Sequence, residues 1–232
     1  MRARYGASIA LLLAALLFGC GGNSGSGYGG GSDGGSSEGG SSESESTGDG
    51  NKSSGERIEV GGTEALVWGD GERGVVLSHG AAYDAASWKP QAREIAKNDA
   101  AVLAVEETSK ESIEAAANYL KEERGAKSIT LVGASAGGAP VLEAAGDSDL
   151  ADGVILLSST GDVSNLGDYP KLFVASEGES MSSQVRQMAK DAPDSENKAL
   201  ILSGDAHAQA IFDADQGDKL LQAIIKRVKE NS

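Results

Sequence analysis

Two hydrophobic periods alternate along residues 56–232. Short, nearly continuous apolar runs predict strands at 57–60, 64–68, 74–80, 101–105, 128–133, 153–159, 170–176 and 198–204. Amphipathic segments with apolar positions three and four residues apart predict helices at 87–98, 109–125, 136–146, 182–192 and 218–231. Because strands and helices alternate from residue 74 onwards, we predict an α/β fold with a mostly parallel sheet and helices on both faces.

Local signals support several of these elements. Gly61 and Gly62 separate the first two predicted strands, which is typical of a β-hairpin. Pro90 falls in the first turn of its helix, where a missing N–H is harmless. Ser109 is a suitable N-cap for the next helix, and Gly125 suits its C-terminal end.

Residues 1–55 follow neither period. Arg2 and Arg4 precede an apolar run over residues 7–18, which suits the central region of a signal peptide and is too short to span a bilayer. The run closes in "LFGC", which resembles a bacterial lipobox ending at Cys20. We therefore predict a lipoprotein signal peptide at 1–19 and lipid attachment to Cys20. The alternatives are a buried N-terminal helix and an ordinary secretory signal with an incidental cysteine.

Gly and Ser fill most of the next segment, so residues 20–55 are predicted to be a lipidated Cys followed by a flexible tether. The lipid would be the membrane anchor of an extracytoplasmic protein in the cell envelope, with no transmembrane helix in the mature chain. Residues 56–232 are then long enough for one folded domain.

The formal net charge of −15 argues against a nucleic-acid partner, because an acidic surface repels phosphates. The chain holds 2 His and 1 Cys, so an internal disulfide is excluded. We expect no metal site and no cofactor, since no acidic cluster has metal-ligand spacing. A monomer is expected.

Reactive residue types stand where predicted strands end. Ser135 lies in "GASAG" after the strand at 128–133, and Glu177 and Glu179 follow the strand at 170–176. His207 follows the last strand. In parallel sheets these ends gather at one edge, so a serine, an acid and a histidine are expected to meet there. Together they can perform nucleophilic acyl transfer, with His as base and the carboxylate as its partner.

These segments resemble the α/β-hydrolase family over nearly all of residues 56–232. "GASAG" is similar to the family's G-x-S-x-G nucleophile elbow between a strand and a helix. "LSHGAAYDAASW" resembles its H-G oxyanion segment, and "GDAHAQAIF" resembles its terminal histidine loop. The resemblance implies the α/β-hydrolase fold and serine-based hydrolysis.

Site roles follow from the resemblance. It implies that Ser135 is the nucleophile and His207 the general base and acid. The backbone N–H groups of Ala81 and Ala136 would form the oxyanion hole. His79 is expected to hold the oxyanion loop by hydrogen bonds.

The sequence does not single out one carboxylate as the partner of His207. Glu179 lies where the family places its carboxylate, and Glu177 and Asp162 remain alternatives. Asp205 is too close to His207 along the chain to approach it easily.

The strands at 153–159 and 170–176 are joined by a short connection, so we predict a compact fold without a lid domain and an open, shallow site. Such a site suits small or exposed acyl groups. Tyr83 and Trp88 are expected either to line the acyl pocket or to pack the loop. The predicted activity is hydrolysis of carboxylic esters, thioesters or related acyl bonds. An acyltransferase with the same triad and a catalytically silent binding lipoprotein are the alternatives.

Overall fold

The computed structural model describes residues 55–147, 149–194 and 196–231. The predicted signal peptide at 1–19, Cys20 and the tether up to residue 54 lie outside this part of the chain. Gly55, the last residue assigned to the tether, is buried with a φ of +83°, and a Cβ built on it would meet the Trp68 ring at 2.5 Å. The packed region thus includes Gly55.

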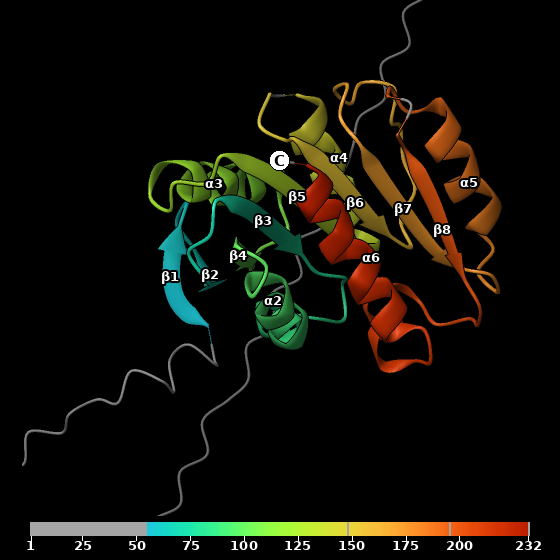
Figure 1. The fold of residues 1–232 in the computed structure, drawn as a ribbon, viewed down its shortest axis with the longest axis horizontal. Helices are drawn as coiled ribbons and strands as arrows, with labels where there is room; N and C mark the ends of the chain where they lie inside the picture. The colour runs from blue at the N-terminus through green and yellow to red at the C-terminus, as the bar shows by residue number, and fades with distance from the viewer. Residues whose placement is uncertain (1–54, 148, 195, 232) are drawn as a thin grey trace, which may run out of the picture. The chain divides into compact units, whose positions relative to one another are not determined.

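The described residues form an eight-stranded sheet in the order β1-β2-β4-β3-β5-β6-β7-β8. Figure 1 shows these strands fanning across the molecule from β1 at the left to β8 at the right. The first two are antiparallel to their neighbours, and the pairs from β4 to β8 are parallel. The strands are β1 (Glu56–Val60), β2 (Thr63–Trp68), β3 (Arg73–Ser78), β4 (Ala100–Val105), β5 (Ser128–Ala134), β6 (Gly153–Leu157), β7 (Lys171–Ser176) and β8 (Lys198–Leu202).

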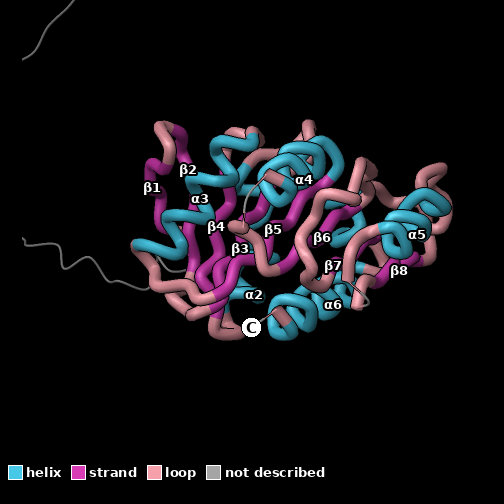
Figure 2. The backbone as a smooth tube through the Cα atoms, turned by 90° about the horizontal axis from the view of Figure 1, so that it is seen from above, coloured by secondary structure: helices cyan, strands magenta, loops and turns pink. Residues whose placement is uncertain are grey.

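Helices cover both faces of this sheet, as predicted. Helices α3, α4 and α5 lie on one face, and α2 and α6 lie on the other (Figure 2). The α-helices are α2 (Lys89–Ala96), α3 (Lys110–Glu122), α4 (Gly138–Gly146), α5 (Ser182–Asp191) and α6 (Gly217–Glu230). Three 3-10 helices are described, η1 (Ala85–Trp88), η2 (Ser135–Gly137) and η3 (Ala208–Asp213).

The core has two layers, because side chains of a strand point alternately to the two faces. In β4, Leu103 packs into the layer under α3 and α4, whereas Val102 packs under α2 and α6. Both side chains are fully buried. Strands buried on both faces explain why the sequence shows apolar runs there and not an alternation.

Helix ends differ from the sequence prediction by a few residues. The segment predicted at 87–98 is split into η1 and α2, and Pro90 lies in the first turn of α2. Ser109 caps α3 by accepting a hydrogen bond from the Ser112 backbone N–H. The helix predicted from residue 136 begins as α4 at Gly138, because the chain first makes the tight turn of η2.

Candidate active site

Ser135 directly follows β5 and is the first residue of η2, at a sharp turn of the chain. Its φ is +49°, a left-handed conformation that is rare for a residue with a side chain. Close packing explains the two glycines around it. A Cβ on Gly133 would lie 2.7 Å from the Gly137 carbonyl oxygen, and one on Gly137 would lie 2.6 Å from the His79 carbonyl oxygen. The G-x-S-x-G spacing is therefore required by the turn itself.

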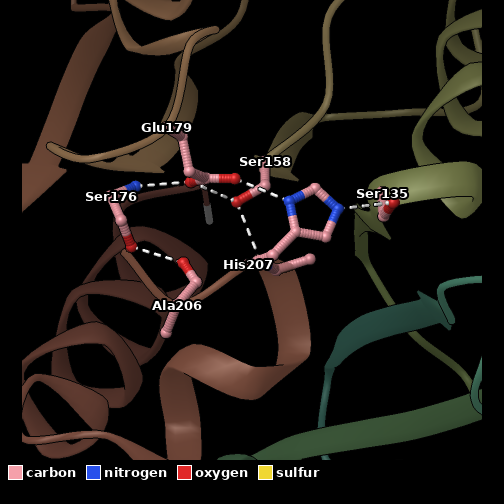
Figure 3. Close-up of polar contacts among 7 residues, drawn as sticks. Ser135, Ser158, Ser176, Glu179, Ala206 and His207 are labelled. Carbon is pink, nitrogen blue, oxygen red and sulfur yellow. Dashed lines mark hydrogen bonds and ion pairs between the residues drawn. The ribbon is translucent and has the colours of Figure 1, made fainter. Parts of the chain in front are cut away.

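His207 reaches Ser135 from the end of β8. Its Nε2 lies 2.8 Å from Ser135 Oγ (Figure 3). Ser135 follows β5 and His207 follows β8, so the contact joins the ends of two different strands. The His207 side chain is 50% exposed, so its ring lies at the surface. Ala208, the next residue, has a φ of +50° and turns the chain into η3. An accessible imidazole beside a hydroxyl can take its proton.

Glu179 holds the other side of the imidazole. Its Oε1 lies 2.6 Å from His207 Nδ1, and its side chain is only 8% exposed. A carboxylate only accepts hydrogen bonds, so Nδ1 carries the proton and Nε2 is left to accept from Ser135 Oγ. The hydrogen bonds in Figure 3 thus form an unbroken series from Glu179 through His207 to Ser135.

The second oxygen of Glu179 is also fully engaged. Oε2 accepts from the Ser176 backbone N–H at 2.6 Å and from Ser158 Oγ at 2.8 Å. Ser158 is buried, has a φ of +45°, and accepts in turn from the Ala208 N–H at 2.9 Å. One hydroxyl therefore fixes both the acid and the turn that carries the base.

The structure does not bring the alternative acids to His207. Asp162 is exposed and accepts from both the backbone N–H and the hydroxyl of Ser164, which lowers the pKa of its carboxyl. Glu177 and Asp205 are exposed, and His207 Nδ1 contacts Glu179 instead. Because the chain turns after β7, with the Glu179 N–H donating to the Ser176 carbonyl, Glu179 points back over the strand end.

The predicted oxyanion loop lies beside the nucleophile. A Cβ built on Gly80 would be 3.5 Å from Ser135 Cβ, which places the backbone before Ala81 against Ser135. The ring nitrogens of His79 lie 2.8 Å from the Gly80 carbonyl oxygen and 3.0 Å from the Glu106 carbonyl oxygen. Ala136 is the second residue of η2, in the first turn after Ala134, where the first N–H groups have no partner within the helix.

The two aromatic residues of this loop have different settings. Trp88 is buried and packs edge-on against Phe212, with ring centroids 5.9 Å apart, so it belongs to the core. Tyr83 is 38% exposed, and its ring comes within 3.6 Å of the Cβ position built on Gly80. Tyr83 is therefore an exposed aromatic side chain on the loop whose Gly80 lies against Ser135.

Sequence reasoning missed Ser158, Ser176 and Gln209. Ser176 Oγ donates to the Ala206 carbonyl just before His207 (Figure 3). Gln209 accepts from the Gly80 N–H at 2.8 Å. The two serines stand at the ends of β6 and β7, so a polar residue closing a buried strand was the available signal; Gln209 carried no local signal.

Metal-binding clusters and membrane-spanning helices are both absent from the described residues. Within residues 55–147, 149–194 and 196–231, no group of three or more His, Cys, Asp or Glu is placed to hold a metal ion. No helix in the same ranges is both long and apolar enough to cross a bilayer.

The fold was compared with known proteins. No family model matches the chain, and no curated protein sequence matches it. Solved structures do resemble it. An esterase from the bacterial hormone-sensitive lipase family has a TM-score of 0.63 at 15% identity, with 76% of this chain and 84% of that chain covered. Dienelactone hydrolase from Anabaena variabilis has a TM-score of 0.58 at 14% identity, covering 76% and 96%.

Monoacylglycerol lipase from Paleococcus ferrophilus has a TM-score of 0.59 at 14% identity, with 75% of this chain and 100% of that chain covered. At such identities the likeness shows the fold and nothing finer. The predicted fold class is confirmed: residues 55–231 have the α/β-hydrolase fold, as a compact, mostly parallel sheet with helices on both faces.

Proposed function

We propose that the protein is a serine hydrolase that cleaves carboxylic esters or thioesters through an acyl-enzyme on Ser135. One observation carries the proposal, namely the chain of contacts from Glu179 Oε1 to His207 Nδ1 at 2.6 Å and from His207 Nε2 to Ser135 Oγ at 2.8 Å. Serine is a weak nucleophile until a base removes its proton, and this geometry supplies the base and orients it. The similar solved structures include an esterase and a monoacylglycerol lipase, which supports the proposal of an ester hydrolase.

Acylation follows from the geometry. Ser135 Oγ attacks the substrate carbonyl carbon while its proton moves to His207 Nε2, and Glu179 stabilises the imidazolium. The carbonyl oxygen becomes an oxyanion and accepts from the N–H groups of Ala81 and Ala136. The bond to the leaving oxygen or sulfur then breaks, and that atom takes the proton from His207.

Deacylation repeats the sequence with water. His207 removes a proton from water, the hydroxide attacks the acyl carbon, and Ser135 Oγ leaves with the proton from Nε2. The products are a carboxylic acid and the free enzyme. Because the His207 side chain is half exposed, water has direct access to the acyl-enzyme. An acyl acceptor other than water would reach the same intermediate by the same route, so acyl transfer is the alternative reaction of this site.

The substrate is expected to be small or to present an exposed acyl group. The connection between β6 and β7 spans only residues 158–170, which is too short for a helical lid. Tyr83 adds one exposed aromatic side chain near Gly80, on the loop that lies against Ser135. An open site of this kind makes few apolar contacts with a long acyl chain.

We also propose that Cys20 carries a lipid that anchors the domain to the outer side of the cell membrane. The support is the order of charged, apolar and small residues before Cys20 and the Gly/Ser-rich segment after it. Mass spectrometry of the N-terminal peptide from the native host checks this: we expect a chain that begins at a diacylated Cys20. Cys20→Ala should release the protein from the membrane fraction.

A fluorophosphonate probe gives the direct test of the catalytic proposal. Residues 46–232, which include the whole compact unit, are treated with the probe, and the adduct is mapped by mass spectrometry. We expect labelling at Ser135 that is lost in Ser135→Ala and reduced by several orders of magnitude in His207→Ala. Absence of labelling in a folded wild-type sample would favour the catalytically silent binding protein.

A further inference from the structure

A buried glutamine connects the histidine loop to the oxyanion loop. Gln209 lies on η3, two residues after His207, and is only 5% exposed. Its Oε1 accepts from the Gly80 backbone N–H at 2.8 Å, and its Nε2 donates to Ser87 Oγ at 2.8 Å. Burying an amide is costly unless it is hydrogen-bonded, and this one is paired at both ends.

The partners fix the orientation of this amide. A backbone N–H only donates, so the atom facing Gly80 has to be the oxygen. The amide nitrogen Nε2 then faces Ser87 Oγ, which donates its own hydrogen to the Asp84 carbonyl and therefore accepts from Nε2–H. The donor and acceptor roles of the Gln209 amide and of Ser87 Oγ are therefore fixed by their partners.

These two hydrogen bonds hold the two ends of the segment between β3 and α2. Gly80 is at its start, directly before Ala81, and Ser87 is inside η1. Glu106 holds the same segment from the other side, where its carbonyl oxygen lies 3.0 Å from His79 Nε2 and its carboxylate accepts from the Ala85 N–H at 3.1 Å. Hydrogen bonds to Glu106 and Gln209 thus hold the backbone on both sides of Ala81 along the chain.

The Gly80 hydrogen bond also decides which N–H remains for a substrate. Because the Gly80 N–H is used by Gln209, it is not available to a developing oxyanion. The next N–H along the chain is that of Ala81, on a loop whose Gly80 lies against Ser135. The value of an oxyanion donor depends on its being fixed before the reaction.

We propose that Gln209 is a positioning residue, which holds the oxyanion loop so that the Ala81 N–H faces the carbonyl oxygen attacked by Ser135. It acts from the segment that carries His207, and so sets the oxyanion hole and the base relative to each other. The inference rests on the proposed hydrolase function.

Gln209→Met keeps the size of the side chain and removes both hydrogen bonds. We expect kcat to fall roughly 10- to 100-fold, because loss of a whole oxyanion donor costs about 100- to 1000-fold and a misplaced one should cost less. KM should stay within about threefold, since the contact forms chiefly in the transition state. The acidic limb of the pH–rate profile should not move, since the contacts of His207 with Glu179 and Ser135 are untouched.

A transition-state analogue separates this role from a structural one. An alkylboronic acid bound to Ser135 places an oxygen in the oxyanion hole, whereas the product carboxylic acid does not need the tetrahedral geometry. Gln209→Met should weaken boronate inhibition by the same roughly 10- to 100-fold as kcat, with product inhibition little changed. Amide hydrogen exchange at Gly80 should become faster in the same variant.

Two other variants complete the design. Ser87→Ala removes only the Nε2 contact and should lower kcat less than Gln209→Met; it also serves if Gln209→Met does not fold. Asn231→Leu is the matched control, because Asn231 is another buried amide and donates to Thr130 near the start of β5. The control should lower stability and leave kcat and boronate affinity unchanged.

The outcomes are distinct. If wild type reacts with fluorophosphonate and Gln209→Met behaves like Asn231→Leu, the positioning role of Gln209 is overturned while the hydrolase proposal stands. Ser87→Ala decides in the same way where Gln209→Met does not fold. A parallel loss of boronate and product affinity would also overturn it, since it would indicate a general change of the site. If folded wild type is not labelled, the hydrolase proposal fails and this inference fails with it.

Discussion

Strand β7 has a charged side chain sheltered from water at each end, and the two are held in different ways. Lys171 at its start is fully buried, and its Nζ donates to the carbonyl oxygens of Gly167 (2.6 Å), Tyr169 (2.5 Å) and Pro193 (2.8 Å). Glu179, just past the other end, is 8% exposed and accepts from a backbone N–H, a serine hydroxyl and His207.

The two charges differ in what they contact. The three hydrogen-bond acceptors of Lys171 Nζ are main-chain carbonyls of loops, and none of them belongs to the residues around Ser135, so these bonds contribute to folding. One partner of Glu179 is a half-exposed imidazole that in turn contacts a nucleophile. A buried charge is costly in either place, but only at Glu179 can the negative charge stabilise a positive charge that forms during a reaction.

The largest expected effect is on Glu179. Glu179→Gln keeps the size of the side chain and removes its charge, so the imidazolium loses its partner and the ring can adopt the wrong tautomer. We expect kcat/KM to fall by roughly 10² to 10⁴ while the midpoint of thermal unfolding moves little. Ester-hydrolysis rates measure this. Glu177→Gln and Asp162→Asn are the matched controls. A larger fall in kcat/KM in either control would assign the triad carboxylate to that residue instead of Glu179.

Lys171→Met should give the opposite result. Removing the ammonium leaves three backbone carbonyls without their partner, at a cost of about 2–5 kcal/mol in the free energy of unfolding. The kcat/KM of the folded fraction should be unchanged, because Lys171 lies at the end of β7 away from the reactive edge. Urea unfolding and kinetics on the same sample check this. A large fall in kcat/KM in fully folded protein would break the comparison.

The pH dependence of stability sharpens the same contrast. Burial lowers the pKa of Lys171 from 10.5 to about 8. Between these two values the unfolded chain binds more protons at this site than the folded chain does. The unfolding free energy of wild type relative to Lys171→Met should therefore rise between about pH 8 and pH 10.5, by up to about 3 kcal/mol.

Paired urea titrations at pH 7.5, 9 and 10.5 measure this, and the other alkaline groups cancel in the difference. A flat difference would mean that the three carbonyls and the Tyr169 ring, 4.4 Å from Nζ, keep the ammonium charged despite its burial.

The smallest expected effect concerns a neutral partner of Glu179. Ser158→Ala removes the hydroxyl that donates to Glu179 and accepts from Ala208. We expect kcat to fall roughly 5- to 30-fold, as for loss of one hydrogen bond to a charged group. Ser164→Ala is the matched control, because its hydroxyl donates to the exposed Asp162. Equal rates in the two variants would show that the Ser176 N–H alone is enough to place Glu179.

Much of the fold could be read along the chain because its signals are local. The buried strands appear as apolar runs, and the elbow at Ser135 appears as glycines whose absent side chains the turn requires. Helix ends were predicted less accurately than the strands. The 3-10 helices η1 and η2 take the place of the first turns expected for two helices, because the chain turns tightly there before the α-helix begins.

The sequence by itself determined the α/β architecture, the nucleophile elbow and the candidate base, because apolar period and turn chemistry act over a few neighbouring residues. Only the tertiary structure showed that Glu179, and not Glu177 or Asp162, contacts His207, and only it revealed the contacts of Ser158 and Gln209. Those contacts join residues 28, 50 and 129 positions apart, and such pairs meet only through the order of strands in the sheet and the turns at their ends.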